Sequence, residues 1–149
     1  MRAVLQRVSM AEVRVEGDLV GSIAAGWLVL VGVADGDQAA DSDWLADKVA
    51  NLRAFADGEG KMNRNVKEAG GAVLVVSQFT LVADCRKGRR PGFDAAARPQ
   101  DAERLYLRVA DRLRFAGLEV ATGKFRADMK VELVNDGPVT FLLDSRKAF

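Results

Sequence analysis

Two uninterrupted apolar runs constrain the fold of this chain more than any other feature of its sequence. The first is "WLVLVGV" at residues 27–33, and the second is "AVLVVSQFTLVA" at residues 72–83. A run of this length with apolar side chains on both faces is typical of a strand in the interior of a sheet. Ser77 and Gln78 interrupt the second run. We therefore expect two buried strands, the second with a polar stretch in it.

A helical pattern follows the first of these strands. Apolar residues recur at helical spacing from Leu45 to Ala56, after a polar loop. This spacing places them on one face of a helix, and a polar side chain before it can satisfy the first free N–H groups. The pattern predicts a helix at 43–56 with Asp41 or Ser42 as its cap.

A second helix is predicted after the second strand. Pro99 is suited to a first helical turn, and Gly117 is suited to a helix end. Between them, Leu105, Val109 and Leu113 lie on one face and predict one buried stripe.

The two ends of the chain carry strand patterns with turns. Residues 11–17, "AEVRVEG", alternate between apolar and polar, and Gly17-Asp18 leads into "LVGSI", which predicts a hairpin. Near the other end, apolar runs at 129–134 and 138–143 predict two further strands, separated by the turn residues "NDGP".

These elements predict an α/β fold with mixed β-sheet layers and two helices. Their order is β-β-β-α-β-α-β-β(-β), with no linker or repeat, so we expect a single compact domain over residues 1–149. The two strand–helix units predict some parallel pairing, and the hairpins predict antiparallel strands.

Composition excludes several functional classes. The chain has 149 residues, a formal net charge of +1 and 49% hydrophobic residues, which is typical of a soluble globular protein rather than a broadly basic nucleic-acid binder. No stretch has the roughly 18 apolar residues of a membrane span, and the first residues lack a signal-peptide pattern. With a single cysteine, Cys85, no internal disulfide can form. We expect a cytoplasmic protein without a membrane partner.

The absence of histidine limits the possible chemistry further. There is no histidine in the chain, so Ser-His-Asp and Cys-His arrangements and the most frequent zinc ligand are excluded. Cys85 has no histidine to deprotonate it and activate it as a nucleophile. No motif for a nucleotide phosphate or a calcium ion is found. We expect no cofactor and no metal.

Two segments remain as candidate sites. Ser77, Gln78 and Thr80 are polar groups at the end of a buried strand, so they are either hydrogen-bonded within the protein or face a pocket. The segment "CRKGRRPGF" places four cations on one loop, which is either a solvated loop or an arm that binds phosphates. These cations are Arg86, Lys87, Arg89 and Arg90.

The dipeptide Gly137-Pro138 is unusual at the start of a returning strand. Proline has no N–H to donate to a neighbouring strand, and a peptide bond that precedes proline can be cis at modest cost. The residues alone do not say why so rigid a dipeptide is placed there.

Several motifs together resemble one family over essentially the whole chain. They are "MRAVLQRVS", "LRAFADGEGKMN", "VSQFTLVAD", "GRRPGF" and "TGKFRADMKVELVNDGPVT", in this order. The sequence is similar to the D-aminoacyl-tRNA deacylase family, of the D-tyrosyl-tRNA deacylase type. The resemblance implies a hydrolase for chiral proofreading: it cleaves the ester between a D-amino acid, or glycine, and the terminal adenosine of tRNA. It also implies a cytoplasmic homodimer without a metal.

The resemblance also implies roles for the candidate residues. Gly137 and Pro138 would form a Gly-cisPro dipeptide inserted into the partner subunit's site, where it rejects L-aminoacyl groups. The backbone around Phe79 and Thr80 would stabilise the developing charge, and the 2′-hydroxyl of the terminal ribose would activate water. Thr80 as a nucleophile is the alternative.

The remaining roles concern the nucleic acid. The resemblance implies that Ser77 and Gln78 shape the adenosine end of the pocket, and the cationic loop is the candidate for tRNA binding near the acceptor stem. Two other functions stay open on the residues alone. One is a non-catalytic tRNA-binding module, and the other is a small-metabolite hydrolase that uses Cys85.

Overall fold

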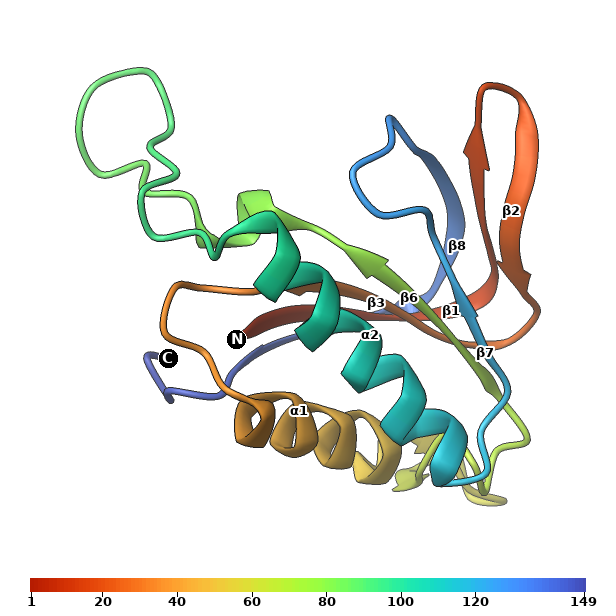
Figure 1. Cartoon of the computed structure of the whole chain (residues 1–149). Helices are drawn as coiled ribbons and strands as arrows, with labels where there is room; N and C mark the ends of the chain where they lie inside the picture. The colour runs from red at the N-terminus through yellow and green to blue at the C-terminus, as the bar shows by residue number, and fades with distance from the viewer.

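A six-stranded mixed sheet forms the centre of the computed structural model, which describes the whole chain from Met1 to Phe149 (Figure 1). Across the sheet the strand order is β2-β1-β3-β6-β7, and β8 pairs along the other edge of β1. The strands are β1 (Arg2–Val15), β2 (Asp18–Ile23), β3 (Gly26–Gly32), β6 (Ala72–Ser77), β7 (Val120–Thr122) and β8 (Lys130–Asp144).

Two helices connect the parallel strands and lie on the same face of the sheet (Figure 1). Helix α1 (Ala39–Asn51) joins β3 to β6, and helix α2 (Pro99–Phe115) joins β6 to β7. Both strand pairs are parallel, because a crossing helix returns the chain to the same end of the sheet. The predicted α/β class and the two strand–helix units are therefore confirmed. Neither helix is long and apolar enough to cross a membrane.

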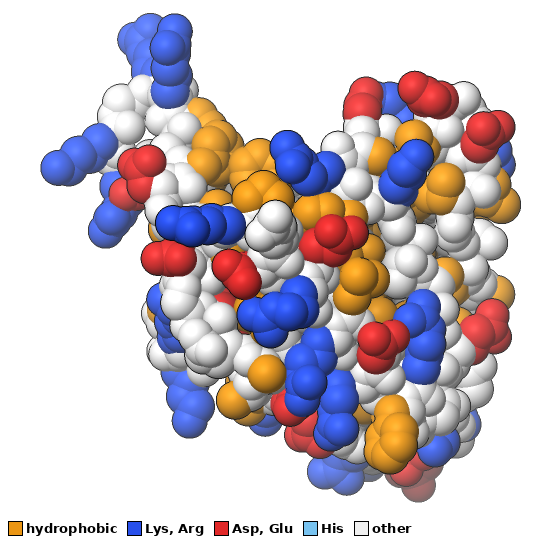
Figure 2. All heavy atoms as spheres, in the orientation of Figure 1, with side chains coloured by type: hydrophobic (Ala, Val, Ile, Leu, Met, Phe, Trp, Pro, Cys, Tyr) orange, Lys and Arg blue, Asp and Glu red, His pale blue; other side chains and the backbone are white.

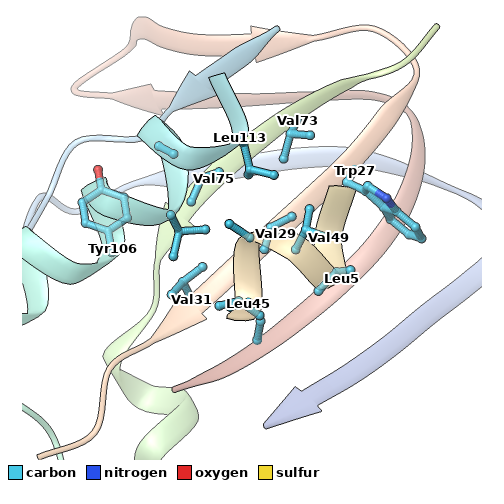
Figure 3. Close-up of a cluster of buried hydrophobic side chains, with 14 of the residues drawn as sticks. Leu5, Trp27, Val29, Val31, Leu45, Val49, Val73, Val75, Tyr106 and Leu113 are labelled. Atoms are coloured by element: carbon cyan, nitrogen blue, oxygen red, sulfur yellow. The ribbon is translucent and has the colours of Figure 1, made fainter. Parts of the chain in front are cut away.

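Both faces of the central strands are buried, as the two apolar runs predict. On the helix side, Val29 and Val75 belong to a cluster of 23 buried residues that includes Leu113 of α2 (Figure 3). On the opposite side, Leu28 and Leu74 belong to a second cluster of 8 residues. Each fully buried side chain of this kind contributes about 1.5–3 kcal/mol by its removal from water. The central strands are therefore packed against apolar side chains on both faces.

The prediction for the second helix is confirmed and that for the first is shifted. Helix α2 begins at Pro99 as expected, and its predicted stripe is buried. Helix α1 begins four residues before the predicted position, because Gln38 is its cap. Asp41 lies inside the helix, where its carboxylate accepts the backbone N–H of Gln38 at 2.8 Å. Ser42 is also helical and is fully buried.

Helix α1 also ends earlier than predicted. Leu52 leaves the helical conformation, with φ −61° and ψ 120°. The next residues form β4 (Phe55–Ala56), which pairs with β5 (Met62–Arg64) in a segment expected to be a loop. Phe55 is drawn into this hairpin because its ring packs on the indole of Trp27, with centroids 4.9 Å apart. A contact across the sheet thus overrides the local helical pattern.

The N-terminal hairpin is confirmed, with its turn one residue earlier than expected. Val15 pairs with Asp18, so the two-residue loop is Glu16-Gly17, and both residues have positive φ angles of 51° and 84°. This combination is typical of the turn that matches the twist of two antiparallel strands. In β2 of this hairpin, Gly21 packs closely against the backbone of Thr122 in β7. A Cβ on Gly21 would lie 2.5 Å from the carbonyl oxygen of Thr122. The sheet therefore curls towards closure.

The predicted C-terminal hairpin is wrong. Residues 130–144 form one long strand, β8, and both halves pair with β1: Thr140 lies opposite Gln6, and Asn135 lies opposite Val8. Between these pairs β1 has one residue where β8 has four, so residues 136–139 form a bulge. The turn residues "NDGP" are placed in this bulge. Strand β7, three residues long, had no counterpart in the prediction.

Candidate active site

The polar end of β6 is where the sheet gives way to an irregular segment. Strand β6 stops at Ser77, not at residue 83 as predicted, and the backbone N–H of Gln78 donates to the carbonyl of Val31 at 2.7 Å. A 3-10 helix, η1 (Phe79–Val82), follows. Its approach to β3 depends on Gly32, since a Cβ there would lie 2.9 Å from Cβ of Leu81. The end of β6 is thus turned out of the sheet by close backbone packing.

A cavity of about 520 Å³ opens at this end of the sheet and is lined by 15 residues, 10 of them hydrophobic. Ser77, Gln78 and Phe79 form one wall, the start of α2 at Pro99 forms another, and residues 125–129 between β7 and β8 form the third. Figure 2 shows apolar surface in this hollow, between a projecting loop and the β1–β2 side of the molecule. A concave, mainly apolar cavity of this size is typical of a small-molecule or nucleoside site.

The turn after β6 leaves two backbone donors without a partner. The backbone N–H groups of Phe79 and Thr80 make no hydrogen bond within the chain. They are the first N–H groups of η1, which have no acceptor inside the helix itself. Thr80 does not line the cavity with its side chain, and its hydroxyl oxygen accepts a hydrogen bond from Nε2 of Gln78. The backbone of this turn is therefore free to donate, while the Thr80 oxygen is engaged.

The third wall of the cavity was not predicted as a candidate site from residue chemistry. It carries the only two charged residues of the lining, Arg126 and Asp128. Asp128 forms an ion pair with Lys130, with Nζ 3.1 Å from Oδ1. Arg126 has a φ angle of 62°, in the left-handed region. In the sequence, the only local signal for this wall is the stretch after Gly123, whose residues alternate between charged and apolar.

The cationic loop projects from the mouth of the cavity (Figures 1 and 2). Asp84 and Gly92 close its base by exchanging backbone hydrogen bonds of 2.8 and 2.9 Å. Arg86 donates two hydrogen bonds to Asp84, and these bonds lower the pKa of the Asp84 carboxyl well below its usual range. Lys87, Arg89 and Arg90 form no ion pair and are exposed. Three of the four predicted cations are therefore free for an external anion.

An aromatic pair ties this loop to the end of β6. The rings of Phe79 and Phe93 lie with centroids 5.0 Å apart, and both residues are partly exposed. Cys85 is exposed in the loop and does not line the cavity. The hypothesis of a cysteine hydrolase at this cavity therefore has no geometric support.

The bulge of β8 lies apart from the cavity of its own chain. Gly137 and Pro138 are exposed, their peptide bond is cis, and neither lines the cavity. The side chain of Asn135 connects the two ends of the bulge to β1: its amide donates to the carbonyls of Arg7 at 2.9 Å and Val139 at 3.1 Å.

Arg7 fixes the other side of the bulge. Its guanidinium donates to the carbonyl of Ala54 at 2.7 Å and to the carbonyl of Asp136 at 3.3 Å. It also lies 3.4 Å from the Asp136 carboxylate. The side chain of Arg7 is mostly buried, whereas that of Asp136 is exposed, so the contact to Ala54 is the better shielded from water. The position of the dipeptide is therefore fixed by contacts that connect it to β1 and, through Arg7, to the segment between α1 and β4.

Comparison with known proteins identifies the family to which this chain belongs. The family model described as D-Tyr-tRNA(Tyr) deacylase matches residues 4–144. The chain belongs to the D-Tyr-tRNA(Tyr) deacylase family. The family and enzyme class predicted from the sequence are confirmed.

Curated relatives match this chain over its full length. It is 64% identical to the D-aminoacyl-tRNA deacylase of Anaeromyxobacter dehalogenans, with all of both chains covered. It is 62% identical to that of Symbiobacterium thermophilum, with 100% of this chain and 99% of the relative covered. A solved structure named "c-Myc DNA Unwinding Element Binding Protein" superimposes with a TM-score of 0.90 at 37% identity, covering 97% of this deacylase and 98% of that chain.

The cavity brings together part of the predicted site. Ser77, Gln78 and Phe79 line it, and Thr80 follows them in η1 without being part of the lining. The cationic loop starts beside it, whereas Gly137 and Pro138 lie elsewhere on the chain. The deacylase fold thus separates the predicted residues into two regions.

Proposed function

We propose that the protein hydrolyses the ester bond of D-aminoacyl-tRNA, and of glycyl-tRNA, to give free tRNA and amino acid. The observation that carries this proposal is the pair of unpartnered N–H groups of Phe79 and Thr80, at the polar end of a cavity large enough for a terminal adenosine. Backbone donors fixed in this way are suited to the oxyanion of an ester hydrolysis, because they need no reorganisation as charge develops.

The reaction proceeds without a basic side chain. Water attacks the ester carbonyl carbon, the carbonyl oxygen takes up negative charge, and the bond to the ribose 3′-oxygen breaks with a proton passing to that oxygen. The chain has no histidine, and Asp128, the one carboxylate in the lining, is paired with Lys130. The 2′-hydroxyl of the same ribose is the group that activates the water. Positioning and oxyanion stabilisation are what the protein contributes.

A nucleophilic Thr80 is the less favoured mechanism. A threonine hydroxyl needs a base to accept its proton. The neighbour of the Thr80 hydroxyl is the Gln78 amide, which donates to it and cannot accept a proton from it. Thr80 therefore acts through its backbone N–H.

The substrate's chirality is read by Gly137 and Pro138 of a second copy of the chain. The dipeptide is exposed, its bulge is held by Arg7 and Asn135, and it does not line the cavity of its own chain. In a two-fold dimer the same contact is made twice, so each bulge can enter the other copy's cavity. A wall of main-chain atoms excludes an L side chain, admits a D side chain that points away, and cannot exclude glycine.

The cationic loop binds the tRNA backbone next to the acceptor stem. Lys87, Arg89 and Arg90 are exposed and unpaired beside the cavity mouth. Phosphate contacts of this kind position the nucleic acid and do not read the amino acid. Arg86, paired with Asp84, holds the loop base.

The proposal is tested with a matched pair of D- and L-tyrosyl-tRNA. We expect rapid release of D-tyrosine and an intact L-ester, measured as acid-precipitable radioactivity over time. A D-tyrosyl-tRNA that stays charged while bound would indicate a tRNA-binding module. A third substrate with a terminal 2′-deoxyadenosine tests the role of the 2′-hydroxyl, and hydrolysis at the normal rate would contradict the substrate-assisted step.

A further inference from the structure

Arg126 is the one cation in the cavity lining, and it has no partner within the chain. It is exposed and takes part in no ion pair or side-chain hydrogen bond. The neighbouring carboxylate, Asp128, is already paired with Lys130. A cation of this kind is available to an anionic group of whatever occupies the cavity.

The backbone at Arg126 adopts a conformation that its residue type disfavours. With a φ of 62° it lies in the left-handed region, and the N–H of Ala127 donates to the carbonyl of Lys124 at 3.2 Å to close the turn. The third position of such a turn favours glycine, because a Cβ crowds the following carbonyl. A glycine here would relieve the strain, so the arginine is unfavourable for folding. Residues held in this way are a reason to ask for a functional role.

We propose that Arg126 binds the phosphate that joins the terminal adenosine to the preceding nucleotide. This inference rests on the proposed function. The cavity lining is mainly apolar, so the nucleoside and the aminoacyl group enter it while the phosphate stays at the mouth. The amino acid's carboxyl group is esterified in the substrate. The phosphodiester is therefore the anion nearest to the terminal adenosine, and a guanidinium fork matches its oxygens.

The contact differs from those of the projecting loop. Lys87, Arg89 and Arg90 lie on a loop outside the cavity, where they can meet phosphates further along the tRNA. Arg126 belongs to the cavity wall, so it can fix only the last nucleotide. It thereby sets how deeply the ester is placed against the N–H groups of Phe79 and Thr80.

Two small substrates separate this role from a general effect of charge. They are 3′-O-D-alanyl-adenosine and the same ester carrying a 5′-phosphate. We expect Arg126→Gln to lower kcat/KM for the phosphorylated ester by about tenfold, as for loss of a hydrogen bond to a charged group. The nucleoside ester should be hydrolysed at an unchanged rate. Arg126→Lys should retain part of the preference for the phosphate.

Lys124→Gln is the matched control, since it removes a cation from the same turn but outside the cavity lining. It should leave both esters unaffected. Arg126→Gly should unfold at a higher temperature than the wild type while losing the phosphate preference, because relief of backbone strain and loss of the contact have opposite consequences.

Equal losses for both esters, no loss for either, or an equal loss in Lys124→Gln would each overturn the proposal. If the wild-type protein leaves D-aminoacyl-tRNA charged, the proposed function is wrong and the role of Arg126 falls with it. Normal hydrolysis of D-aminoacyl-tRNA by wild type, with unchanged rates in Arg126→Gln, overturns the role of Arg126 alone.

Discussion

Strands β6 and β8 are both interrupted by polar or turn-forming residues, but with opposite results. At Ser77, β6 ends, the chain turns into η1, and a cavity of about 520 Å³ opens beside the turn. At residues 136–139, β8 only bulges and then resumes its pairing with β1. The first interruption provides a concave surface with free donors, and the second provides an exposed convex one.

The difference follows from what lies next to each strand. β6 is an interior strand, and the turn that leaves its end is held by the close approach of η1 to Gly32 of β3. β8 is an edge strand, and its bulge is fixed only from the β1 side by Arg7 and Asn135. A rigid convex element on an edge strand is suited to enter a cavity on another molecule. Under the proposed function, the two regions are complementary halves of one site.

The largest effect is expected from Gly137→Ala. Gly137 has a φ of 125°, and a Cβ there would lie 2.8 Å from Cγ2 of Val139 and 3.1 Å from Nη2 of Arg7. The bulge must shift to accommodate it, and a misplacement of about 1 Å can cost about a hundredfold in rate. We expect that loss in kcat/KM for D-tyrosyl-tRNA. Gly58→Ala, which meets no atom within 4 Å, is the control. Similar activities for the two variants would mean that the bulge has no role in the reaction.

A smaller effect is expected on the cavity side from Gly32→Ala. Its Cβ would lie 2.9 Å from Cβ of Leu81 and 3.0 Å from the Gln78 carbonyl oxygen, so η1 must move by a few tenths of an ångström. We expect about a tenfold fall in kcat with little change in KM, because the Phe79 and Thr80 donors act on the transition state. Steady-state kinetics give both constants. A rise in KM alone would place η1 in substrate binding and not in charge stabilisation.

Variants of the cationic loop should weaken tRNA binding without changing the preference for D- over L-aminoacyl groups. Arg89 and Arg90 are free cations, and neutralising both to glutamine should reduce the slope of log affinity against log salt by about 2. The loss should be the same for D-, L- and uncharged tRNA, measured by filter binding. The double variant Lys48→Gln and Lys61→Gln removes the same charge outside the loop, from the last turn of α1 and from the segment between β4 and β5. An equal change in this control would mean that the loop affects tRNA binding only through the net charge of the protein.

The smallest effect is expected from Thr80→Ala. Its backbone N–H remains and only the hydroxyl that accepts from Gln78 is lost, so activity should stay within about fivefold of wild type, as for loss of one neutral hydrogen bond. Single-turnover rates on D-tyrosyl-tRNA measure this. Complete loss in a folded variant that still binds tRNA would identify Thr80 as the nucleophile.

Local patterns predicted the elements whose structure depends on neighbours in the chain. The two apolar runs gave β3 and β6, and the stripe from Leu105 to Leu113 gave α2. The C-terminal hairpin was wrong because the residues "NDGP" favour a turn locally, while β1 is long enough to pair with both halves of β8. Turn-forming residues do not reveal whether the chain reverses after them.

The site was predictable only in part for the same reason. Ser77 and Gln78 stand out because they interrupt an apolar run, and this signal is local. The cavity walls at residues 96–99 and 125–129 meet them only because β3, β6 and β7 lie side by side in parallel. That adjacency is a property of the whole sheet. The separation of Gly137 from the cavity likewise depends on the pairing of β8 with β1.

Mixing two inactive variants tests most directly whether each active site is built from two copies of the chain. Ala96→Trp fills the cavity and leaves the bulge intact, while Gly137→Ala damages the bulge and leaves the cavity intact. Each must first be shown to be folded and dimeric. The two are then unfolded, mixed in equal amounts and refolded together, so that mixed dimers form.

In a mixed dimer the intact cavity of one copy meets the intact bulge of the other. Random pairing then restores one working site in half of the dimers, so we expect about a quarter of the wild-type rate on D-tyrosyl-tRNA. If cavity and bulge act within one chain, no mixed dimer contains a complete site. The mixture would then stay as inactive as its components, and that result would contradict a site shared between two copies.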